Sequence, residues 1–199
     1  MKNTLTSLFL CSILSLYAQI NPKDVEIVRD NFGVPHIFGK TDADVAYGLA
    51  WAHAEDDFKT IQESYLAGNA LLSQHLGKRG AGPDFVTQFI GSKEFIEENY
   101  DEKISPEYKK VVEGYAQGFN RYAETHPEEV LHEALFPITP KMMLRYAQLQ
   151  LFVSSGGDYW ISRILANSVK LETPKEEITG SNTFAFNSAK TTDGNTYLA

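Results

Sequence analysis

Residues 179–199 read TGSNTFAFNSAKTTDGNTYLA, and this stretch predicts a hairpin of two strands. In residues 182–187 aromatic side chains alternate with small or polar ones, the period of two that a strand requires. Asp193-Gly194 supplies the turn, because Gly adopts a positive φ without steric cost. The return strand starts at Asn195, and because the sequence stops within it, we expect a truncated chain.

Ser181 opens the first of these strands, directly after Gly180. Gly-Ser-Asn alone is a common tripeptide and indicates only a junction between a loop and a strand. The longer run of residues 180–186, GSNTFAF, is followed by Thr-x-Asp-Gly and an apolar strand. This run resembles the start of the β subunit in the penicillin amidase family. The family belongs to the N-terminal-nucleophile hydrolases and includes penicillin acylases and acyl-homoserine-lactone acylases.

Two upstream blocks carry an independent resemblance to the same family. Residues 25–38, VEIVRDNFGVPHIF, resemble its opening strand pair, and residues 41–58, TDADVAYGLAWAHAEDDF, resemble its first long helix. Residues 76–179 match only in being helical. The fold class that we predict is therefore α+β: a mostly helical α-subunit region followed by the first strands of an αββα sandwich.

The expected domains follow from composition and from this resemblance. Residues 1–18 form a signal peptide, 19–169 the helical region, 170–180 a polar linker before the processing site, and 181–199 the start of the β subunit. The signal has Lys2 before an apolar run that is too short to span a bilayer. A buried N-terminal helix is the alternative. We expect a periplasmic or secreted protein without a stable membrane anchor.

Composition narrows the function classes. The 199 residues are 43% hydrophobic and carry a net charge of −8, without a cluster of Lys and Arg, so we expect no nucleic-acid partner. The one cysteine, Cys11, lies in the expected signal, so the mature protein would use no disulfide, thiol nucleophile or Cys-based zinc site.

The patterns further predict a sequence of short elements. A strand over 25–29 leads through a turn at Gly33-Val34-Pro35 into a second strand. A capping box at Thr41 starts a helix that runs to about Gly68 or Gly77. The remaining expected elements are a loop over 78–84 and helices over 85–99, 105–125 and 141–154, the last ending at Gly156-Gly157.

Several residues outside the hairpin suggest a site but are better explained by structure. His36 is expected to be a packed or hydrogen-bonded histidine. His53 and Glu55 face different directions on a helix, so they do not make a metal pair, and residues 55–57 are expected to be a solvated or salt-bridged face. The helical stripe Val111, Val112, Tyr115, Phe119 and Tyr122 is expected to be core.

Phe152, Tyr159 and Trp160 could line a cleft for an acyl group, although packing is the favoured interpretation. Asp158 could help to bind the calcium that occurs in part of the family. The α-chain calcium ligand of the family is a Glu that cannot be placed in this region, so calcium stays an open expectation. No organic cofactor is expected.

Serine needs a base within hydrogen-bond reach, and the sequence holds no Gly-x-Ser-x-Gly elbow. Cutting the Gly180–Ser181 bond would give Ser181 an α-amine whose pKa, about 7.7–8.0 in model peptides, suits it as that base. The resemblance implies such a self-cleaving precursor, with Ser181 as catalytic nucleophile and a β subunit as partner of the α chain. It also implies oxyanion donors beyond Ala199, so we expect this polypeptide alone to be inactive.

Two hypotheses for the function of the protein are consistent with the sequence. The first is an exported acylase that hydrolyses a small-molecule acyl amide, with a slight lean toward acyl-homoserine lactones over penicillins. The second is a non-enzymatic periplasmic helical module for binding or scaffolding. A fragment beginning at Ser181, lost in Ser181→Ala, would distinguish the enzyme from the module.

Overall fold

The structure is a computed structural model, which describes residues 19–166 and 185–198, and side chains of residues 19–166 and 187–196. The chain divides into two compact units, Met1–Ser162 and Arg163–Ala199, and each is described here by itself.

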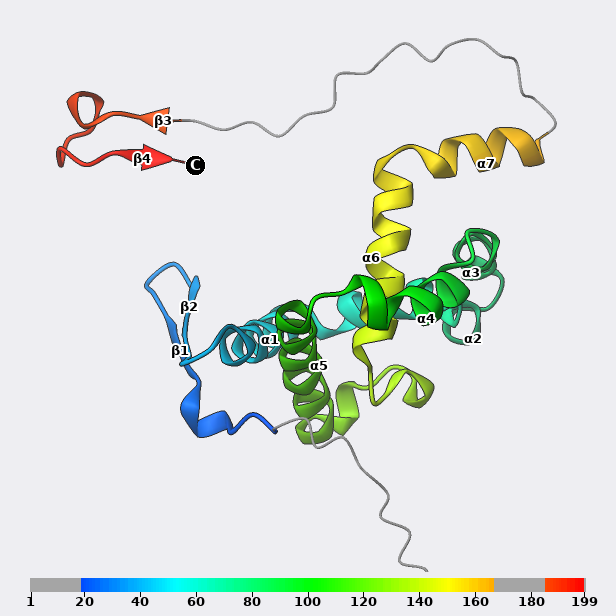
Figure 1. The fold of residues 1–199 in the computed structure, drawn as a ribbon, viewed down its shortest axis with the longest axis horizontal. Coiled ribbons are helices and arrows are strands. Elements are labelled where there is room, and N and C mark those ends of the chain that lie inside the picture. The colour runs from blue at the N-terminus through cyan, green and yellow to red at the C-terminus, as the bar shows by residue number, and fades with distance from the viewer. Residues whose placement is uncertain (1–18, 167–184, 199) are drawn as a thin grey trace, which may run out of the picture. The chain divides into compact units, whose positions relative to one another are not determined.

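The first unit is mostly helical, as the sequence predicts, and a small antiparallel hairpin precedes its long helices (Figure 1). In the hairpin Glu26 lies opposite Phe38, and the turn is made by Gly33 at φ +83°. The strands and helices are β1 (Glu26–Arg29), β2 (Pro35–Phe38), α1 (Asp42–Gly68), α2 (Leu72–Leu76), α3 (Ala81–Phe89), α4 (Ser92–Lys103), α5 (Pro106–Thr125), α6 (Pro140–Ser154) and α7 (Gly157–Leu165), which extends into the second unit.

Local capping chemistry fixes where the long helices begin. Thr41 Oγ1 accepts a hydrogen bond from the Asp44 backbone N–H at 3.2 Å, and Asp44 accepts one from the Thr41 N–H at 2.9 Å, which confirms the predicted capping box. Ser105 caps α5 in front of Pro106, also as predicted. Thr139 caps α6 in the same way, in front of a proline.

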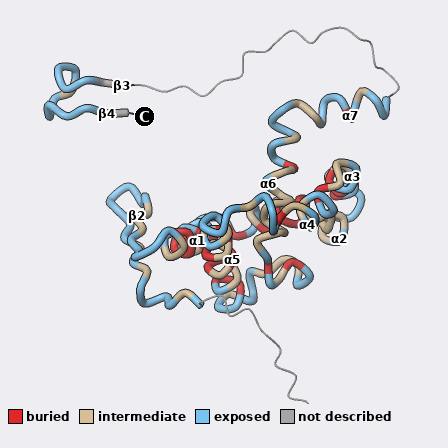
Figure 2. The backbone as a smooth tube through the Cα atoms, viewed as in Figure 1, coloured by how far each residue is buried: buried red, intermediate tan, exposed pale blue. Residues whose placement is uncertain are grey.

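The core lies where α1 packs against α5, with α6 and the residues before it closing one end (Figure 2). Phe119 is fully buried between the rings of Phe58, Tyr65 and Phe136, at centroid distances of 5.0 to 5.8 Å. The predicted stripe on α5 is core only in part, because only three of its five residues, Val112, Phe119 and Tyr122, are buried.

Glycine lets α5 approach α1 closely. A Cβ on Gly114 would meet the Ala43 carbonyl oxygen at 2.3 Å, and one on Gly118 would meet the Tyr47 carbonyl oxygen at 2.3 Å. Side chains at these positions would push the helices apart. The close packing of this pair therefore depends on two residues that lower helix propensity.

The long helix α1 is interrupted at Asp57, whose φ of −159° and ψ of 68° are not helical. Asp57 starts the second segment by accepting a hydrogen bond from the Thr60 N–H at 3.1 Å. Arg29 of β1 forms ion pairs with Glu55 at 3.1 Å and Asp56 at 2.8 Å just before the break. The acidic run is thus a salt-bridged face, as predicted.

Two predictions between α1 and α5 are wrong. Residues 78–84 are not a loop, because a short 3-10 turn at Gly77–Arg79 leads into α3 at Ala81. The expected helix over 85–99 is two helices, divided at Gly91, which has φ +64°. The buried Asp84 on α3 explains the compact arrangement, since it accepts hydrogen bonds from two backbone N–H groups at the start of α2.

Gly156 takes φ +79° after the end of α6, and helical structure resumes directly with α7. In the second unit β3 (Ala185–Phe186) pairs antiparallel with β4 (Tyr197–Leu198), which confirms the predicted hairpin. Its connection is longer than a tight turn, since a 3-10 turn at Ser188–Lys190 precedes the positive-φ Gly194.

Candidate functional site

The predicted processing site, Gly180 and Ser181, lies outside the described residues. The hairpin that follows it is described from residue 185 onward. The candidate nucleophile therefore stays a prediction from sequence, and the site that the structure describes is in the helical unit.

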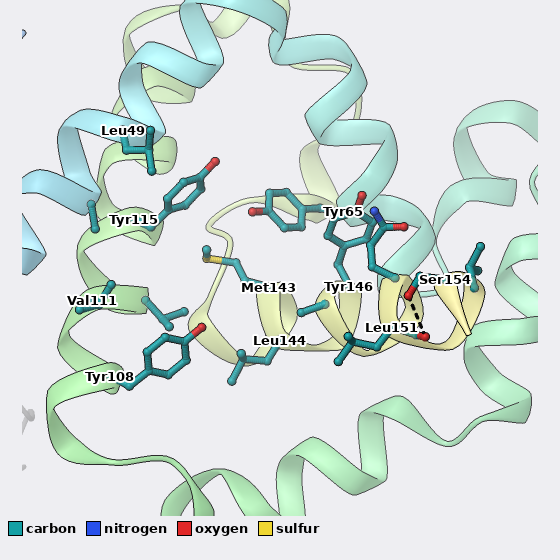
Figure 3. A pocket seen from close by; sticks show the side chains of 15 residues that line it. Leu49, Tyr65, Tyr108, Val111, Tyr115, Met143, Leu144, Tyr146, Leu151 and Ser154 are labelled. Carbon is teal, nitrogen blue, oxygen red and sulfur yellow. Dashed lines mark hydrogen bonds between the residues drawn. The ribbon is translucent and has the colours of Figure 1, made fainter. Parts of the chain in front are cut away.

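An apolar pocket of about 740 Å³ opens between α1, α5 and α6. Figure 3 shows Tyr108, Val111 and Tyr115 of α5 on one side and Met143, Leu144 and Leu151 of α6 on the other. The lining residues carry no charge, and are Ala46, Leu49, Tyr65, Tyr108, Val111, Val112, Tyr115, Met143, Leu144, Tyr146, Ala147, Gln150, Leu151, Val153 and Ser154. Such a lining suits an acyl chain or an aromatic ring.

Two of the tyrosine hydroxyls that line this pocket, those of Tyr65 and Tyr115, are hydrogen-bonded. Tyr65 donates to Tyr115, whose hydroxyl lies 3.0 Å from Nδ1 of His53. Burial, and then the neighbouring Tyr115, raise the pKa of Tyr65 far above its ordinary value, and burial also raises the pKa of Tyr115. Both tyrosines are therefore neutral at any physiological pH.

The back wall of the pocket is closely packed, because α1 and α6 touch there. A Cβ on Gly68 would meet Cα of Tyr146 at 2.5 Å, and the Tyr146 ring packs edge-on against Tyr65 with centroids 5.4 Å apart. On the rim, Ser154 Oγ donates to the Leu151 carbonyl at 3.1 Å. The pocket offers a binding surface, whereas its one serine is engaged with backbone and has no base beside it in the lining.

The three aromatic residues singled out from the sequence do not line this pocket. Phe152 is half-buried, and its ring lies where a Cβ on Gly157 would be. Tyr159 and Trp160 are on α7 and pack edge-on against each other at 5.4 Å. Sequence reasoning placed Tyr115 and Val111 in the core and missed the pocket. The signal that it overlooked is the exposed aromatic Tyr108, one helical turn before Val111 and two turns before Tyr115.

The other polar candidates have structural partners. His36 Nε2 lies 3.4 Å from Asp30, as expected of a hydrogen-bonded histidine. His53 contacts Tyr115, whereas Glu55 accepts from Trp51 Nε1 at 2.8 Å, so the two do not converge. Asp158 lines a separate pocket of about 520 Å³ together with Glu63. No third metal-ligating side chain joins them within the described residues.

Comparison with known proteins shows the family to which this chain belongs. A family model for penicillin amidase matches residues 24–199, and the chain belongs to the penicillin amidase family. Two relatives illustrate the range. Penicillin G acylase of Escherichia coli is 25% identical over 71% of this chain. The acyl-homoserine lactone acylase PvdQ of a Pseudomonas fluorescens strain is 24% identical over 78% of it.

The helical fold also matches a solved structure. A thermostable penicillin G acylase from Alcaligenes faecalis aligns with a TM-score of 0.53 and 18% identity, and the match covers 79% of this chain and 97% of that chain. At this identity the likeness concerns the fold alone. This chain spans about a fifth of the length of the two curated relatives, 17% and 22% respectively. No helix within the described ranges is long and apolar enough to cross a membrane.

Proposed function

We propose that this chain is the amino-terminal part of an acylase that hydrolyses linear amides, with Ser181 as its nucleophile. The observation that carries the proposal is the extent of the family match, residues 24–199, which includes Gly180 and Ser181 as well as the helical unit. In the whole protein the hairpin from residue 185 would then belong to an αββα sandwich.

The proposed chemistry starts with maturation. Ser181 Oγ attacks the Gly180 carbonyl carbon, the peptide C–N bond breaks, and the acyl group moves from nitrogen to oxygen. Water then hydrolyses the ester, which leaves a carboxylate on Gly180 and a free α-amine on Ser181. This amine takes the hydroxyl proton when Oγ attacks a substrate amide, and passes it to the leaving amine. Hydrolysis of the acyl-enzyme releases the carboxylic acid.

The lengths of the relatives support a precursor that is cut into chains. The curated relatives are about five times longer than the aligned segment, whereas the solved Alcaligenes faecalis chain is covered to 97%. One relative, from a Pseudomonas strain, is named a proenzyme. We propose on this basis that the helical unit becomes an α chain that pairs with a separate β chain.

For the substrate we propose an apolar acyl group on a small-molecule amide. The relatives include both penicillin acylases and acyl-homoserine lactone acylases, so an arylacetyl group and a fatty acyl group are the two classes to compare. The uncharged tyrosine and aliphatic lining of the 740 Å³ pocket supports an apolar ligand. We further propose that residues 1–18 direct export to the periplasm or the medium.

The test is hydrolysis of two chromogenic anilides, phenylacetyl and decanoyl, by the full-length gene product. We expect turnover of at least one, and its loss in Ser181→Ala because the nucleophile is gone. Ser188→Ala serves as the matched control, since this exposed serine follows seven residues later and should keep full activity. Equal activity in wild type and Ser181→Ala would refute the proposal, as would a wild type without activity on either anilide.

A further inference from the structure

The first residue of the proposed exported chain is a glutamine. Export signals are removed after a small residue, and Ala18 is the small residue at the end of the mostly apolar segment that follows Lys2. Removal of residues 1–18, which the proposed export includes, would leave Gln19 with a free α-amino group.

The structure leaves Gln19 accessible. Its side chain is exposed, and it makes no hydrogen bond with any residue that the structure describes. Hydrogen bonds to the helical unit begin one residue later, where the N–H of the half-buried Ile20 donates to Oε1 of Gln117 on α5 at 2.9 Å. Asn21 then caps the 3-10 turn Pro22–Asp24. A cut before Gln19 therefore removes none of these contacts and leaves an exposed end of one residue.

A glutamine at an amino terminus carries an electrophile within reach of its own amine. The unprotonated α-amine attacks Cδ of the side-chain amide, and the new N–Cδ bond closes a five-membered lactam. The bond from Cδ to Nε2 breaks, and the amide nitrogen leaves as ammonia with the proton that the α-nitrogen gives up. No oxidant or reductant is needed. The pKa of an α-amine is about 7.7–8.0 in model peptides, so part of the population is unprotonated at neutral pH.

We infer, on the basis of the proposed export, that Gln19 becomes a pyroglutamate and that the exported chain has a blocked amino terminus. The lactam removes the positive charge of the α-ammonium group and the free amine that an aminopeptidase recognises. The hydrogen bond from Ile20 to Gln117 is kept, because ring closure uses only atoms of Gln19.

The experiment is mass spectrometry of the amino-terminal peptide of the full-length gene product, purified from the periplasm or the medium, with the intact mass taken before digestion. We expect a peptide that starts at residue 19 and is lighter than Gln-Ile-Asn-Pro-Lys by one ammonia. Edman degradation of this chain should read no residue until pyroglutamyl aminopeptidase is added, after which Ile20 should be read first.

Gln19→Asn is the matched control, because its side chain is one methylene shorter and the same attack would have to close a strained four-membered ring. Residue 19 is exposed, so the variant should fold, and its chain should keep a free α-amine that Edman degradation reads as Asn. The same block in Gln19→Asn would overturn the inference.

A wild-type chain that begins with an uncyclised Gln19 would overturn the inference and leave the proposed export standing. A wild-type chain that begins at any other residue would overturn it too, and a chain that still begins at Met1 would contradict export as well. None of these results bears on the proposed cut before Ser181, which is read from a different fragment.

Discussion

At the residue scale, the clearest electrostatic centre is Glu97 on α4. The Lys141 ammonium, and then the Arg145 guanidinium, hold the pKa of the Glu97 carboxyl below its ordinary value, against the opposing effect of burial. A carboxyl with a lowered pKa stabilises the fold fully above its unfolded pKa, about 4.3. This contribution is lost as the pH falls through the folded pKa.

Glu97→Gln should therefore lower the free energy of unfolding at pH 7 by about 1 kcal/mol, since solvent screens a side chain that is 42% exposed. The difference from wild type should close as the pH falls below about 4, because the wild-type carboxyl then protonates too. Urea denaturation at pH 7 and pH 3 measures both values. Glu98→Gln, on the same helix, should change neither, and a difference that persists at pH 3 would contradict this account.

At the element scale, the contact between α1 and α5 determines the stability of the helical unit. Gly118→Ala would place a Cβ against the Tyr47 carbonyl, and overpacking of this kind typically costs about 1–3 kcal/mol. We expect a net loss of about 2 kcal/mol in unfolding free energy, although Ala is the better helix former. Urea denaturation of the full-length protein provides the measurement.

Gly82→Ala in α3 is the matched control, since a Cβ there meets nothing within 4 Å. It should gain about 0.5–1 kcal/mol from helix propensity and from a less flexible unfolded chain. A stabilised Gly118→Ala protein would show that the helices do not approach as closely as the structure describes.

Elements whose limits depend on nearby residues were predictable from the sequence. Thr41 and Ser105 start their helices through side chains that reach the next turn, so the local pattern was sufficient. The region between α1 and α5 was not predictable in this way. Asp84 caps α2 from twelve residues away, and Gly91 divides a helix whose polarity pattern continues across it.

At the scale of the whole molecule, sequence and structure identify different features, the residue Ser181 and the apolar pocket of the helical unit. Ser181 was predicted because its neighbours match a family motif and because the chemistry requires a particular residue type. The apolar pocket was missed, because it depends on how far α6 stands from α5, which no local pattern encodes. Tyr115 shows the difficulty. Its side chain packs against the hydrophobic core, whereas its hydroxyl is hydrogen-bonded to Tyr65 and His53.

The central claim is that Ser181 becomes the amino terminus of a separate chain. The most direct measurement is intact-mass analysis with amino-terminal sequencing of the purified full-length gene product and of its Ser181→Ala variant. We predict a wild-type fragment that begins Ser-Asn-Thr-Phe and a variant that stays uncut between residues 180 and 181. A wild-type protein that remains one chain, or a variant that is cut at the same bond, would contradict it.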